Sequence, residues 1–162
     1  MNDVNTVSGK NLDKISFDHF KAGLGRGSID LKGLKGGRIH LGTLDGSIKG
    51  EYEPSKEFIA GSLRGPTAVK ILQKENSTAV KIAVRALDGS AIVQLPADTY
   101  EGNFVAVSGP GNGSPVVNAT KPEDVHVTKL RHFLKKGYYK TDNTGSDAFV
   151  RSEHGHTILG FN

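Results

Sequence analysis

The chain contains no cysteine among its 162 residues, which excludes disulfides, thiolate metal sites and cysteine nucleophiles. Tryptophan is also absent, and aromatic residues make up only 7% of the chain. No stretch approaches the roughly 20 apolar residues of a membrane-spanning helix. The N-terminus shows neither the basic region nor the apolar region of a secretory signal. This predicts a cytoplasmic protein if Met1 is the natural start, and a cell-surface or secreted one if the sequence is truncated.

The chain also lacks a large net charge of either sign. The formal net charge is +4, and acidic and basic residues interleave through most of the chain. Such a mild basic balance is compatible with an anionic partner without requiring one.

Glycine, by contrast, is abundant, with 21 residues. From residue 15 onward, short runs of alternating Val, Ile and polar residues are bounded by glycine, a pattern typical of strands joined by tight turns. The sequence therefore predicts an all-β fold, with residues 1–14 as a polar lead-in and residues 15–162 as a single β-repeat domain.

Several segments echo one another along the chain. TLDGSI at 43–48 recurs as ALDGSAI at 86–92, and the pair VR at 84–85 recurs at 150–151, followed by HG at 154–155. The offsets of 43 and 66 residues lie close to multiples of about 22, within the range of stacked supersecondary units. The echoes favour a single-stranded right-handed β-solenoid of short irregular rungs, while a β-sandwich stays open as the alternative.

In a solenoid, the glycine of each echo marks a corner of the coil. We expect Gly46, Gly89 and Gly155 to adopt positive φ or to pack against a neighbouring backbone. We also expect Ile48, Ile92 and Ile158, which follow these corners, to occupy equivalent inward positions on one stacked face.

The same segments resemble a known family, the DUF4097 and head-GIN-like group of adhesin-type β-strand repeat domains in bacteria and fungi. The motifs that carry the resemblance are GSI at 27–29, GSI at 46–48, GSL at 61–63, GSAI at 89–92, IVQLP at 92–96 and GHTI at 155–158. The resemblance implies stacked β-strands and a non-catalytic role, and it transfers no functional residue.

Residues 129–146 form a basic segment before the last strands. Residues 129–140 contain five basic residues, three aromatic residues and no acid. Basic residues neutralise phosphates and aromatic rings stack on bases or sit at a lipid interface, so this segment is a candidate site for an anion such as nucleic acid or a membrane. We expect it to protrude from the domain. The candidate anion-binding residues are Lys129, Arg131, Lys135, Lys136 and Lys140.

No arrangement of residues points to catalysis, a cofactor or a metal site. His154 and His156 would share one side of an extended strand, but a stable metal site needs further ligands. No carboxylates are paired in a way that suggests acid–base chemistry. The sequence therefore predicts a non-catalytic, adhesin-like or scaffold domain that binds a protein partner or a surface glycan. The alternatives are a small lectin-like sandwich and an anion-binding protein acting through residues 129–140.

Overall fold

The computed structural model describes residues 5–74, 79–142 and 144–162 and confirms the all-β prediction. Apart from two short 3-10 turns, η1 (Leu12–Lys14) and η2 (Pro122–Asp124), the elements are strands. The strands are β1 (Asn5–Gly9), β2 (Ser16–Asp45), β3 (Ile48–Arg64), β4 (Thr67–Ile71), β5 (Lys81–Asp88), β6 (Ala91–Leu95), β7 (Gly102–Ser108), β8 (Val116–Ala119), β9 (Val125–Arg131), β10 (Leu134–Tyr139), β11 (Asp147–Ser152) and β12 (Thr157–Phe161).

All of these strands belong to one 12-stranded sheet, with the order β8-β12-β6-β4-β3-β5-β11-β7-β10-β9 and with β2 joining β1 to β3. The pairings are parallel except where β10 pairs with β7 and with β9, so the sheet is mixed. A sandwich needs two sheets, and the described residues form only one.

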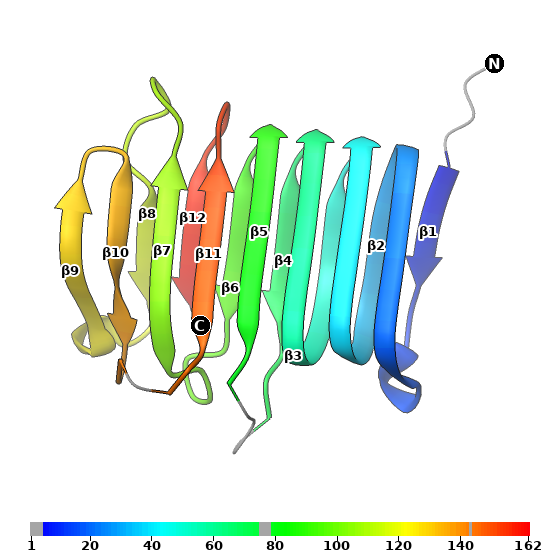
Figure 1. Ribbon diagram of the computed structural model, residues 1–162, viewed down its shortest axis with the longest axis horizontal. Helices are drawn as coiled ribbons and strands as arrows, with labels where there is room; N and C mark the ends of the chain where they lie inside the picture. The colour runs from blue at the N-terminus through cyan, green and yellow to red at the C-terminus, as the bar shows by residue number, and fades with distance from the viewer. Residues whose placement is uncertain (1–4, 75–78, 143) are drawn as a thin grey trace.

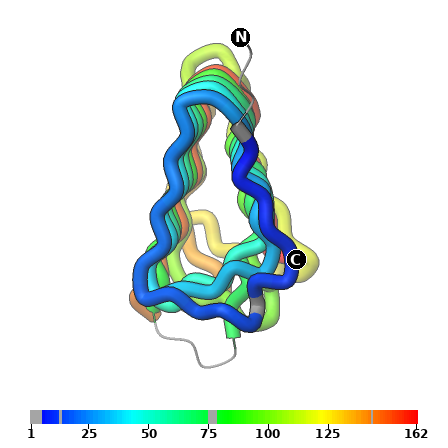
Figure 2. Tube along the Cα trace, turned by 90° about the vertical axis from the view of Figure 1, so that its right-hand side faces the viewer, coloured from blue at the N-terminus to red at the C-terminus, as the bar shows by residue number. Residues whose placement is uncertain are grey.

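The sheet wraps around the core because its long strands run around corners. The first part of β3 pairs with β4, while its second part pairs with β5. Figure 2 shows the result along the length of the molecule, where successive turns of the chain share one triangular outline. In Figure 1, β1 and β9 lie at opposite ends of the row of strands.

Alternation along the strands separates an inner from an outer side. The burial pattern of β7, for example, switches between buried and half-buried residue by residue, as the two-residue period of a strand requires. The inner side is filled by aliphatic residues and by the buried rings of Tyr52, Phe58, Tyr100, Phe104, Tyr139 and Phe161.

The last turn of the chain does not lie at the end of the molecule. Strand β11 pairs with β5 on one side and β7 on the other, and β12 lies between β6 and β8. The C-terminal segment is therefore inserted between two earlier turns, as the strand order in Figure 1 shows. This insertion explains the echo of VR at 84–85 and 150–151, because Val150 and Arg151 pair directly with Val84 and Arg85.

The prediction that three isoleucines are equivalent is wrong. Ile48 is fully buried, and the register continues from it through Thr67 and Ala91 to Thr157. Ile92 and Ile158 pair with each other but are half-buried on the outer side. The second echo carries one extra residue before its isoleucine, and a shift of one residue moves a side chain to the other face of a strand.

The glycines expected at corners form a stacked ladder. Gly46 has φ +157° and Gly89 has φ +153°, and a Cβ added to either would overlap the carbonyl oxygen of a glycine in the preceding turn, Gly27 or Gly65. Gly155 has no positive φ, but an added Cβ there would overlap the carbonyl oxygen of Gly89. Close approach of one backbone to the next therefore requires glycine at all three corners.

The basic segment at residues 129–146 was expected to protrude from the domain, but its first part belongs to the sheet. Residues 129–131 lie in β9 and residues 134–139 form β10, which pairs with β7. Tyr139 at the end of β10 is fully buried and stacks on Phe161, with ring centroids 4.2 Å apart. Core packing of this ring ties the segment to the domain.

Candidate binding site

Because neighbouring strands are parallel and in register, the outward-facing residues of successive turns lie side by side and form columns across the strands. In one column, Gly42 pairs with Gly61, Gly61 with Arg85, and Arg85 with Arg151. The strands β2, β3, β5 and β11 thus present one continuous outer face.

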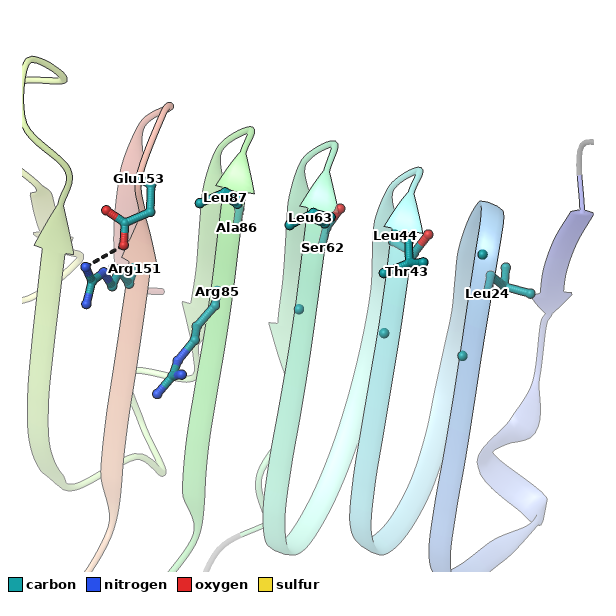
Figure 3. Close-up of a pocket in the computed structure, with 14 residues that line it drawn as sticks. Leu24, Thr43, Leu44, Ser62, Leu63, Arg85, Ala86, Leu87, Arg151 and Glu153 are labelled. Carbon is teal, nitrogen blue, oxygen red and sulfur yellow. Dashed lines mark ion pairs between the residues drawn. The ribbon is translucent and has the colours of Figure 1, made fainter.

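This face is hollowed into an open groove that crosses the strands (Figure 3). The groove has a volume of about 790 Å³. Its lining residues are Gly23, Leu24, Gly25, Gly42, Thr43, Leu44, Gly61, Ser62, Leu63, Arg85, Ala86, Leu87, Arg151 and Glu153.

The floor of the groove is made of glycines at positions where neither the backbone conformation nor a close contact requires glycine. None of Gly23, Gly42 and Gly61 has a positive φ. A Cβ added to Gly23 or Gly42 would meet no atom within 4 Å, and one added to Gly61 would meet only the Arg85 carbonyl oxygen at 3.9 Å. Glycine inside a strand is unfavourable by roughly 0.5–1 kcal/mol relative to alanine. These glycines therefore differ from the corner glycines, since what they provide is empty space.

One wall of the groove is a row of leucines. Leu44, Leu63 and Leu87 follow one another on neighbouring strands in Figure 3, and the aligned pairs Thr43–Ser62 and Ser62–Ala86 fix their register. All three side chains are exposed, and Leu44 is 58% exposed. A row of exposed leucines beside an open trough is typical of a surface that another molecule covers.

The far end of the groove is charged. The guanidinium of Arg85 lies 5.2 Å from the centre of the Phe149 ring, and Arg151 forms an ion pair with Glu153. Among the described residues, no carboxylate lies within ion-pair distance of Arg85. Within the described residues, the groove therefore combines an apolar trough with the Arg85 guanidinium, which has no carboxylate partner there and can meet an anionic group.

The five candidate anion-binding residues do not converge. Lys129 and Lys136 are cross-strand partners on the outer side of the hairpin, and Arg131 pairs with Leu134 on that same side. Lys135 pairs with buried Ala106, so it lies on the opposite, core-facing side. Lys140 follows the hairpin, and its ammonium donates to the Asp98 carbonyl oxygen at 2.7 Å.

His154 and His156 lie between β11 and β12. In the part of the chain that the structure describes, no group of three or more His, Cys, Asp or Glu residues is arranged to hold a metal ion. Within the same residues, no helix is long and apolar enough to cross a membrane.

Three tyrosines have shifted pKa values, and all three are core residues. Burial raises the pKa of Tyr52, Tyr100 and Tyr139. The hydroxyl of Tyr52 donates to the Lys49 carbonyl oxygen at 2.6 Å, and that of Tyr100 donates to the Asn103 carbonyl oxygen at 2.7 Å. None of the three lines the groove, so their shifts reflect packing of the core.

A pattern that three segments share in the sequence corresponds to the groove. The segments GTLDG at 42–46, GSLRG at 61–65 and RALDG at 85–89 share an outward small or basic residue, an inward small residue and an outward leucine before the corner. GSL at 61–63 resembles a corner motif, but the structure places it inside β3, close to the C-terminal end of that strand, and the corner follows at Gly65.

Comparison with known proteins gives no further assignment: the chain matches no family model, no curated protein and no solved structure.

Proposed function

We propose that this protein is a non-catalytic binding module, an adhesin-like or scaffold domain, that holds an extended segment of a partner protein in the groove. The observation that carries the proposal is the glycine floor, where glycine is neither strained nor crowded and yet interrupts strands in neighbouring turns. A strand glycine with this geometry is typical of a place where another chain approaches closely.

We also propose the finer fold assignment, a right-handed single-stranded β-solenoid of the DUF4097 and head-GIN-like type. The parallel pairing of successive turns and their shared outline support it. The antiparallel hairpin of β9 and β10 and the inserted C-terminal turn depart from a regular solenoid.

The lining of the groove favours a protein segment over a glycan. Sugar rings are commonly held by exposed aromatic rings, whose faces stack on sugar C–H groups. Most of the large rings here are buried in the core, and the groove is lined by glycine and leucine instead. An extended segment with apolar side chains and an acidic group near Arg85 fits this lining.

The proposal is tested by screening the purified protein in parallel against a displayed random-peptide library and a glycan array. We expect peptides rich in apolar residues to be selected. The double variant Gly42→Val/Gly61→Val fills the floor and should lose binding to them. Ala68→Val adds the same side chain outside the groove, on a strand segment paired with Lys49 and Ile92, and should bind as the unmodified protein does.

Either of two results would overturn the assignment. One is a glycan that binds equally to the unmodified protein and to the double variant. The other is a set of selected peptides whose affinity is unchanged by the filled floor.

A further inference from the structure

Strand β9 lies at the end of the sheet opposite β1, as Figure 1 shows, and in the described chain its single strand neighbour is β10. We propose that this edge accepts an extended, acidic segment of a partner protein as an added strand. The proposal is independent of the groove, which is formed by β2, β3, β5 and β11.

An edge strand offers backbone N–H and C=O groups that have no partner within the sheet. A peptide that aligns beside such an edge gains main-chain hydrogen bonds, and its alternate side chains meet the two faces of the strand. The side chains of β9 therefore determine which peptide sequence fits.

The core-facing side of β9 is apolar and uncovered. Leu130 pairs with Lys135 and, beyond a shift of the register between β9 and β10, Val127 pairs with Gly137 on the same side. Both β10 residues lie opposite the buried residues Ala106 and Phe104 of β7. Leu130 is nevertheless 68% exposed, and Val127 and Phe133 are also exposed. The inner side of the sheet thus continues beyond the packed core, and no described part of the chain covers these apolar side chains.

The outer side of β9 is basic. Lys129 lies beside Lys136, Arg131 lies beside Leu134, and residues 125–140 contain no acid. A strand that places apolar side chains on the inner side and carboxylates on the outer side would complement both faces. The occupant is therefore a segment that alternates apolar and acidic residues.

Two other occupants fit less well. A second copy pairing through its own β9 would bring Lys129 and Arg131 close to their equivalents, and like charges across a strand pair are unfavourable. A copy pairing through β1 would present NTVSG, which has no acid. A nucleic acid would need converging cations, whereas Lys135 faces the other side and Lys140 is bound to Asp98.

The test uses the full chain and a synthetic seven-residue peptide of alternating Glu and Val, matched to the length of β9. Binding is measured by calorimetry, and the contact is located by amide exchange across the chain. We expect saturable binding with slowed exchange in β9. A scrambled peptide and a peptide with alternate backbone amides methylated should both fail to bind, because the first loses the alternation and the second loses the hydrogen bonds.

A charge exchange provides the matched protein variant. Lys129→Glu/Arg131→Glu should weaken binding of the Glu–Val peptide about tenfold or more and should favour a Lys–Val peptide instead. Both side chains are exposed, so we expect the variant to fold as the unmodified chain does and to give the same circular dichroism.

The proposal is overturned if the methylated peptide binds as tightly as the unmethylated one, or if no binding is seen up to about 1 mM peptide. It is equally overturned if single-stranded DNA of similar length binds more tightly than the peptide at the same site. Self-association that buries β9 would overturn it in favour of a second copy.

Discussion

Glycine occupies two kinds of position in this chain, and they differ in what an added methyl group would meet. At the corners, at Gly46 and Gly89, the methyl would overlap a carbonyl oxygen of the preceding turn. On the outer face, at Gly23 and Gly42, it would meet nothing. The same residue type therefore supports the stacking of turns at one position and keeps a surface open at the other.

The corner glycines give a prediction at this scale. Gly89→Val should lower the free energy of unfolding by about 2–4 kcal/mol, because the side chain forces adjacent turns apart at a strained φ. The neighbouring variant Ser90→Ala removes only the acceptor for the His156 amide, 3.3 Å away, and should cost about 1 kcal/mol or less. Urea denaturation with comparable m-values measures both changes. Equal losses of stability would show that the corner does not need glycine.

Among the elements, β12 has a central place in the packing. It lies between β6 and β8, and its Phe161 ring lies 5.7 Å from Tyr100, 5.8 Å from Phe104 and 4.2 Å from Tyr139, measured between ring centroids. The C-terminal strand thus joins the earlier turns to the end of the molecule that carries the β9–β10 hairpin.

Phe161→Ala should therefore cost about 3–5 kcal/mol of unfolding free energy, as for other buried aromatic truncations. Ile158→Ala is the matched control, since it lies on the same strand but is half-buried on the outer side, and it should cost about 1 kcal/mol. Thermal and urea unfolding of the two variants compare them directly. A larger loss for Ile158→Ala would mean that the inner and outer sides of β12 have been assigned the wrong way round.

At this scale, the sequence predicts element type better than element position. Alternation of Val and Ile with polar residues predicts strands, and strands are what form. The echo of VR at 84–85 and 150–151 reflects a real pairing of neighbours. The inner side was predicted wrongly for Ile92 and Ile158, because side chains alternate between the two faces of a strand and one inserted residue moves a side chain to the other face.

The basic residues at 129–140 also look like one cluster in sequence. In the hairpin, however, alternation places Lys135 on the side opposite Lys129 and Lys136.

For the whole molecule, what the sequence could not show is the order of the turns. The VR echo links β11 to β5, but no local pattern shows that β11 and β12 also lie against β7 and β8, since this choice depends on long-range packing. The groove was missed for a related reason. Its residues come from four strands of an outer face, and only the register reveals that Gly42, Gly61, Arg85 and Arg151 share a column.

The central claim is that the outer-face glycines are present for a ligand and not for the fold. The most direct measurement is the melting temperature of Gly42→Val/Gly61→Val beside that of the unmodified protein. Valine suits a strand better than glycine, and a Cβ at either position meets no atom closer than 3.9 Å, so we expect the melting temperature to rise by about 2–4 °C while binding of the selected peptides is lost. A fall of similar size would contradict the account, because it would show that the fold itself needs glycine on this face.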